Sequence, residues 1–192
     1  GYDLFTSLPP TFAQVSDAPV TSEYVVGPGD TIEVQLLGNK TGDFSLTVGR
    51  DGAVRLPDLG PVNVAGLRFP AARAAIEGRV SEQMIGTRAV VSMGELRAIT
   101  VFITGEAERP GSYSIGSLST ITNALFTSGG VSEIGSLRNI QLKRDGRVIT
   151  TLDLYDLLLR GDTRNDARLL SGDVIFIPPV GTTVGVTGEI RR

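Results

Sequence analysis

The sequence predicts an α+β protein made of two small mixed modules in tandem. Short segments of alternating hydrophobicity, typical of half-buried strands, are interrupted by only a few helical segments. The tripeptide Thr104-Gly105-Glu106 recurs as Thr187-Gly188-Glu189, each within a strand-like segment. Gly29-Asp30 before one strand is repeated as Gly172-Asp173 before another. These repeats indicate a modular protein with a unit of about 80 residues.

Residues 1–22 are expected to form an extended N-terminal arm. Pro9, Pro10 and Pro19 interrupt every hydrophobic period there, since proline fixes φ and removes a hydrogen-bond donor. The isolated Phe5 and Phe12 favour docking of this arm on a neighbouring subunit. A disordered tail is the alternative interpretation.

The first module is expected over residues 23–97 and starts with a strand. Ile32, Val34 and Leu36 alternate with polar residues, which is the period of a half-buried strand. Asp30 precedes this strand, and we interpret it as a turn former whose carboxylate accepts backbone N–H groups.

A hairpin is predicted next, with Asp51-Gly52 at its tip between strands through 44–48 and 54–56. Residues 57–61 are rich in proline and glycine and are expected to form a loop. A short strand through Val62 and Val64 then leads to Gly66.

One amphipathic helix completes the first module. Pro70 stands in its first turn, where proline costs no hydrogen bond. Gly86 ends the helix, and a strand over 89–93 follows. The apolar residues recur at helical spacing and are expected to cover a small sheet: Phe69, Ala72, Ile76 and Val80.

The second module is expected over residues 98–180, and residues 181–192 would start a further copy of it. It opens with a strand at 101–103, a type II turn at Pro110-Gly111 and a strand at 113–115. Ser119 or Thr120 is expected to cap a short helix that ends at Gly129-Gly130.

The rest of the second module follows the same pattern. A hairpin is predicted to turn at Asp145-Gly146. Asp153 is expected to cap a second short helix, and Gly161 to end it. The last strand follows Gly172-Asp173 and covers residues 174–177. This succession of elements resembles the β-grasp fold.

Composition excludes several classes of function. The chain has no Cys and no His, which removes thiol nucleophiles, imidazole acid–base chemistry and most zinc sites. The net charge of −3 gives no bulk basic field for nucleic acid. Residues 27–30 do not form a phosphate loop, because no Gly-Lys-Ser/Thr follows. We therefore expect no cofactor and no metal.

Several glycines, prolines and aspartates are interpreted as structural turn residues and not as catalytic groups. They are Gly29, Asp30, Asp51, Gly52, Pro57, Gly60, Gly66, Gly105, Pro110, Gly111, Gly129, Gly130, Gly172 and Asp173.

Two long segments carry a resemblance to a known family. The runs 24–32, 51–60 and 64–67 resemble the polysaccharide export domain of bacterial outer-membrane polysaccharide exporters, the Wza-like family. The runs 101–113, 129–130 and 170–178 resemble its soluble-ligand-binding β-grasp (SLBB) module. Arg68 stands where the family often has a threonine helix cap.

The resemblance implies a periplasmic, outer-membrane-associated ring through whose lumen capsular polysaccharide or exopolysaccharide passes. It implies a homo-oligomer, with an octamer as the expected number of subunits, and an inner-membrane polysaccharide co-polymerase as partner. Members usually have a lipidated N-terminal Cys, and some have a C-terminal membrane helix. A trimmed soluble fragment would lack both and would reach the outer membrane only through those missing parts.

Other functions stay open at this stage. A monomeric periplasmic carbohydrate-binding module is the main alternative, and a cell-surface scaffold of β-grasp repeats is another. A glycosidase needs two carboxylates at fixed separation around a cleft, and the pairs Asp153/Asp156 and Glu106/Glu108 are better explained as a helix cap and strand-end residues. The basic stretch 138–147 is interpreted as the solvated face of a hairpin. The alternative, which assigns it a specific function, is that it attracts an anionic sugar polymer. No residue is nominated as a polysaccharide contact.

Overall fold

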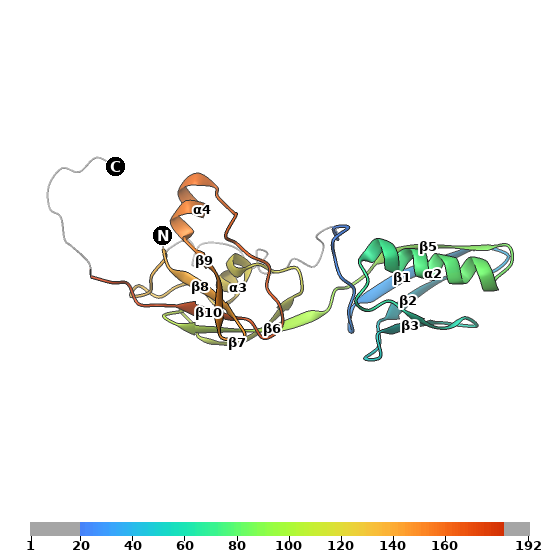
Figure 1. Ribbon diagram of the computed structural model, residues 1–192, viewed down its shortest axis with the longest axis horizontal. Helices are drawn as coiled ribbons and strands as arrows, with labels where there is room; N and C mark the ends of the chain where they lie inside the picture. Colours follow the sequence, from blue (N-terminus) through green and yellow to red (C-terminus); the bar gives the residue numbers. More distant parts are fainter. Residues whose placement is uncertain (1–19, 183–192) are drawn as a thin grey trace. The chain divides into compact units, whose positions relative to one another are not determined.

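The computed structural model describes residues 20–182, and the expected arm and further repeat lie largely outside this range. The described chain divides into two compact units between Ala98 and Ile99. Each unit combines β-sheet with α-helix, as the α+β prediction requires (Figure 1).

The first unit is built around strand β1 (Thr31–Gly38). It lies between β2 (Gly42–Thr47) and β5 (Thr87–Met93), and both neighbours are antiparallel to it. The predicted alternation is confirmed, because the side chains of Ile32, Val34 and Leu36 are buried.

Helix α2 (Phe69–Gln83) packs on β5 (Figure 1). Its buried residues are the four that the helical spacing predicted: Phe69, Ala72, Ile76 and Val80. Pro70 lies in the first turn of the helix. N–H groups in that turn have no acceptor within the helix, so the missing N–H of proline costs no hydrogen bond. Arg68 occupies the N-cap position with no side-chain capping bond.

The predicted hairpin at Asp51-Gly52 is wrong in its strand pairing. β3 (Ala53–Leu56) pairs with β4 (Gly60–Asn63) in a separate two-stranded sheet, whereas β2 pairs with β1. The Gly52 carbonyl accepts the N–H groups of Val64 and Ala65, which holds the end of β4 beside the start of β3. Gly60 is thus a strand residue and not part of a loop.

The second unit contains a five-stranded sheet with the order β7-β6-β10-β8-β9. Its first strand, β6 (Ala98–Gly105), and its last, β10 (Val174–Ile177), lie side by side and parallel. β7 (Gly111–Gly116) flanks β6, and β8 (Ile140–Arg144) pairs with β10 and with β9 (Arg147–Leu152). With helix α3 (Ile121–Thr127) between the second and third strands, this is the β-grasp arrangement.

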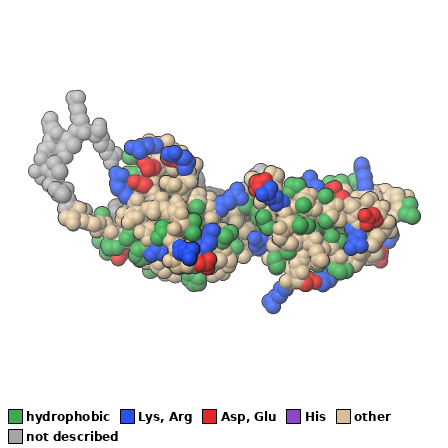
Figure 2. Space-filling view, in the orientation of Figure 1, with side chains coloured by type: hydrophobic (Ala, Val, Ile, Leu, Met, Phe, Trp, Pro, Cys, Tyr) green, Lys and Arg blue, Asp and Glu red, His purple; other side chains and the backbone are tan. Residues whose placement is uncertain are grey.

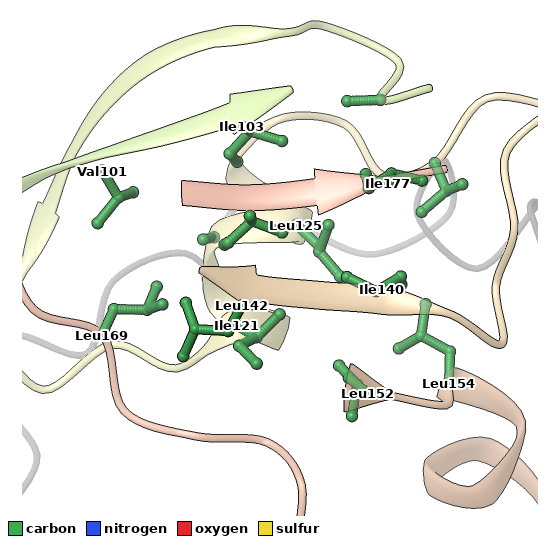
Figure 3. Close-up of a cluster of buried hydrophobic side chains, with 14 of the residues drawn as sticks. Val101, Ile103, Ile121, Leu125, Ile140, Leu142, Leu152, Leu154, Leu169 and Ile177 are labelled. Atoms are coloured by element: carbon green, nitrogen blue, oxygen red, sulfur yellow. The ribbon is translucent and has the colours of Figure 1, made fainter. Parts of the chain in front are cut away.

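The core of this unit lies between the sheet and α3 (Figure 3). Val101 and Ile103 of β6 and Ile177 of β10 point toward Ile121 and Leu125 of α3. All five are fully buried. The strand residues among them are β-branched, which suits a pleated strand. Their side chains are apolar, so they bring no polar group into the core that would need a hydrogen-bond partner.

The turn predicted at Pro110-Gly111 differs from the structure. A type II turn needs φ near +80° at its third residue, but Gly111 has φ 159 and is the first residue of β7. The positive φ lies earlier, at Gly105, with φ 81. A Cβ atom at Gly105 would lie 2.1 Å from the Ile177 carbonyl oxygen, so the parallel approach of β10 requires glycine there.

The turn at Asp145-Gly146 and the N-caps of the two short helices agree with the predictions, whereas α2 ends at Gln83, before Gly86, and the helix at Ile121–Thr127 ends before Gly129. Asp145 and Gly146 both have positive φ and join β8 to β9, as a type I′ hairpin requires. Thr120 caps α3 through a capping box with Asn123. Asp153 caps α4 (Leu154–Arg160), and Gly161 ends it in the left-handed conformation.

Candidate functional site: two buried aspartates before strands

Asp30 closes a four-residue turn immediately before β1. Its N–H donates to the Gly27 carbonyl, and the Gly27 N–H donates back to the Asp30 carboxylate at 2.8 Å. Gly29 supplies the positive φ, 93°, which the third position of such a turn needs. This geometry agrees with the interpretation of Asp30 as a turn former.

The Asp30 carboxylate is fully buried and is held by two further residues. The Tyr24 hydroxyl donates to Oδ1 at 2.7 Å. Arg97 donates twice, from its backbone N–H to Oδ1 at 2.8 Å and from Nη1 to Oδ2 at 2.7 Å. The carboxylate therefore ties the segment before β1 to the segment after β5.

Asp173 repeats this arrangement before β10. Its N–H donates to the Leu170 carbonyl, and the Leu170 N–H donates to Oδ2 at 2.8 Å. Gly172, with φ 89, occupies the position of Gly29. Arg144 at the end of β8 donates from Nε and Nη2 to the two carboxylate oxygens, and these hydrogen bonds raise the pKa of its guanidinium.

These two carboxylates are suited to holding structure. Each has no exposed surface and is surrounded by N–H or O–H donors, which hold the carboxylate oxygens in place. A general base needs an accessible lone pair in reach of a substrate proton. We therefore interpret both aspartates as structural locks.

The acidic pair Asp153/Asp156, considered for glycosidase chemistry, has other contacts. Asp153 accepts the Tyr155 N–H and pairs with Arg138, and Asp156 pairs with Arg160. Figure 2 shows acidic and basic side chains side by side in the region of α4. Among residues 20–182, no cluster of three or more acidic side chains is placed to hold a metal ion.

The other turn residues lie in turns of both units. Asp51 accepts the Ala53 N–H and pairs with Arg55, which lowers the pKa of Asp51. Pro57 lies in the turn between β3 and β4, and Pro110 directly precedes β7. The glycines with positive φ between the strands and helices include Gly52, Gly66, Gly129 and Gly130, and Gly60 has positive φ as the first residue of β4.

Within the basic stretch 138–147, Arg138 and Arg147 are exposed, whereas Lys143 and Arg144 are half-buried. Arg138 lies over the Tyr155 ring, 4.3 Å from its centroid, and Lys143 lies over the Phe176 ring at 4.2 Å. Arg144 is committed to Asp173. Arg147 on β9 is exposed, as predicted.

Sequence reasoning missed Arg97 and Arg144 as partners of the aspartates. Asp30 and Arg97 are 67 positions apart, and Arg144 and Asp173 are 29 apart. Neither spacing has a local periodicity that could reveal it. Only the pairing of distant strands brings these residues together.

Comparison with known families decides which proteins this chain resembles. Residues 18–94 match the polysaccharide biosynthesis/export protein family, and residues 100–177 match the SLBB domain family. The chain belongs to the Wza-like family of polysaccharide export proteins. Asp30 lies in the segment that matches the export family and Asp173 in the segment that matches the SLBB domain, so each domain contains one of the two buried aspartates.

Two curated proteins similar to this chain are named for the transport or export of polysaccharide. The polysialic acid transport protein KpsD of Escherichia coli is 34% identical over 170 residues, which is 88% of this chain and 30% of KpsD. The EPS I polysaccharide export outer membrane protein EpsA of Ralstonia nicotianae is 26% identical over 85% of this chain and 44% of EpsA. The chain thus spans less than half the length of either relative.

No helix within residues 20–182 of this family member has the length and apolar character needed to cross a bilayer.

Proposed function

We propose that this chain is part of a non-enzymatic component that exports capsular polysaccharide or exopolysaccharide. One observation carries the proposal: an export domain over 18–94 is followed directly by an SLBB domain over 100–177. KpsD and EpsA, which match this chain across both domains, are named for polysaccharide transport and export.

The proposed mechanism is geometric. Identical subunits pack side by side in a closed ring, and a wide, wet lumen lets polymer pass without tight binding. Heterologous contacts whose rotation closes produce rings of this kind. We expect an octamer, located in the periplasm in association with the outer membrane, with an inner-membrane polysaccharide co-polymerase as partner.

The proposed boundaries are an arm over 1–22, the export domain over 23–97, the SLBB domain over 98–180 and a further SLBB repeat from 181.

The contacts of the acidic residues in each unit support a structural, non-catalytic role. The two fully buried carboxylates act as locks in rigid turns, and the acidic residues on α4 are ion-paired on the surface. Enzymes usually keep a titratable group with a perturbed pKa in a cleft. The described residues offer a scaffold for assembly more readily than such a centre.

Deletion and complementation of the complete gene test the export function. We expect loss of polymer at the cell surface with retention of polymer inside the cell, and recovery on complementation. Unchanged surface polymer in the deletion strain would refute the proposal. Purified protein that released oligosaccharide from the cognate polymer, with the release abolished by one Asp or Glu substitution, would refute the non-enzymatic part.

Sedimentation tests the ring separately from export. The complete gene product in detergent is expected to sediment as a stable closed oligomer, since heterologous contacts whose rotation closes produce rings. A complete protein that sedimented only as a monomer would favour the carbohydrate-binding module instead.

A further inference from the structure

The five-stranded sheet of the second unit has one face in the core and one face that reaches solvent. Along β6, Ile99, Val101 and Ile103 are buried, and the residues between them are exposed. β8 and β10 alternate in the same way. The side chains that alternate away from the core define what we call the outer sheet face: Thr100, Phe102, Thr104, Gln141, Lys143, Val174 and Phe176.

Two phenylalanines lie near the centre of the outer sheet face. Phe102 is 43% exposed although it stands on an inner strand of the sheet. Phe102 pairs with Val174 and Thr104 pairs with Phe176, so the two phenylalanines are diagonal neighbours on adjacent strands. The exposed part of the Phe102 ring gives this face an apolar surface that a ligand could cover.

A cation is fixed beside these rings. The Lys143 ammonium lies 4.2 Å from the centroid of the Phe176 ring, and Lys143 pairs with Val174 in the adjacent strand. A cation–π contact orients the ammonium while leaving N–H donors for another acceptor.

The charge on this sheet is of one sign. Its five strands contain the charged residues Lys143, Arg144 and Arg147, all basic, and Arg144 is committed to Asp173. The three-stranded sheet of the first unit differs, because its strands contain Glu33 and Asp43 beside Arg88. The one charged side chain of the outer sheet face is therefore the basic Lys143, which is complementary to an anionic group.

We propose that the outer sheet face binds an acidic sugar polymer. A pyranose ring presents C–H bonds on its face that can stack on Phe102, because an aromatic ring has a negative face. A sugar carboxylate can accept from Lys143, and the hydroxyls of Thr100 and Thr104, at alternate positions of the same strand, can bond sugar hydroxyls. The open face of a sheet suits an extended polymer lying across strands.

This inference rests on the proposed function, since it names the residues by which the SLBB domain would contact the exported polymer. The test uses the 192-residue chain with a purified oligouronate from alginate and a neutral dextran oligomer of matched length. Amide signals in β6, β8 and β10 are followed during titration. The oligouronate is expected to shift signals around Phe102 and Lys143, and the dextran to shift them much less. Raising the salt concentration should weaken oligouronate binding.

Matched variants identify the residues responsible. Lys143→Gln and Phe102→Ala are each expected to weaken oligouronate binding about 3- to 10-fold. Lys40 is the only other lysine in the chain and pairs with Asp58 in the first unit, so Lys40→Gln is the control for charge. Val90→Ala removes an exposed apolar side chain, 49% exposed, from the sheet of the first unit and is the control for apolar surface.

The outcomes separate this inference from the proposed function. Binding that is unaffected by Lys143→Gln and Phe102→Ala, or that maps to the first unit, overturns the inference. Loss of binding in a variant whose amide spectrum away from the outer sheet face is unchanged supports it. If the gene deletion abolishes export but the oligouronate binds elsewhere, only the inference fails. If the deletion leaves export intact, the proposed function fails whatever the oligouronate does.

Discussion

Arg144 and Asp173 form a two-point salt bridge, with Nε donating to Oδ1 at 2.7 Å and Nη2 to Oδ2 at 2.8 Å. The Asp173 side chain is fully buried, and that of Arg144 is 30% exposed. Parallel N–H···O bonds of this kind fix orientation as well as distance. The pair therefore fixes the start of β10, the central strand of its sheet, against the end of β8.

Replacing one partner of this pair should destabilise the second unit. Asp173→Ala leaves the Leu170 N–H and the Arg144 guanidinium without their acceptor, and we expect a loss of about 3 kcal/mol in unfolding free energy. Hydrogen exchange of β10 amides measures this. Asp156→Ala breaks an exposed pair with Arg160 and should cost less than about 0.5 kcal/mol. Equal effects of the two substitutions would contradict the assignment of Asp173 as a lock.

The buried aspartate of the first unit, Asp30, can be tested by removing only one of its hydrogen bonds. Tyr24→Phe removes the hydroxyl that donates to Asp30 and keeps the ring. A hydrogen bond to a buried carboxylate is worth about 1.5–3 kcal/mol, so β1 amides should exchange faster by a corresponding factor. Tyr113→Phe removes an exposed hydroxyl bond to the Arg109 carbonyl in the other unit and is the control. Unchanged exchange in β1 would show that Tyr24 adds nothing to the lock.

The buried face of α2 is expected to tolerate no charge. Ile76 is fully buried, and Ile76→Asp would place an unpaired carboxylate in the core at a cost of several kcal/mol, about 3 or more. Ala74 is exposed on the same helix, so Ala74→Asp should cost less than about 1 kcal/mol. Thermal unfolding followed by circular dichroism compares the two, and near-wild-type stability of Ile76→Asp would place Ile76 outside the core.

The Asp162 carboxyl is predicted to titrate at unusually low pH. Hydrogen bonds from the Arg164 side chain, and then from its backbone N–H, lower the pKa of Asp162 from 3.8 to about 2. Because the folded pKa is depressed, the contribution of this pair to stability is present above pH 3.8 and is lost as pH falls through about 2. Carboxyl-carbon NMR should show this titration, and Arg164→Ala should move it upward. A wild-type titration near 3.8 would show that the pair does not persist in solution.

Local patterns in the sequence were enough to predict most elements of this fold. The burial of Ile32, Val34 and Leu36 follows from a period of two, and the buried face of α2 from helical spacing. The hairpin at Asp145-Gly146 follows from two residues that tolerate positive φ. In each case the physical cause acts over a few residues, so a short stretch of sequence contains it.

Pairing between distant segments was decided only by the tertiary structure. The sequence could not show that β3 pairs with β4 and not with β2, because both pairings satisfy the same alternation. It placed Asp30 and Asp173 in turns, but their arginine partners depend on strand neighbours far along the chain. The outer sheet face has the same origin: Phe102, Lys143 and Phe176 come from three strands, and only the order β6-β10-β8 makes them neighbours.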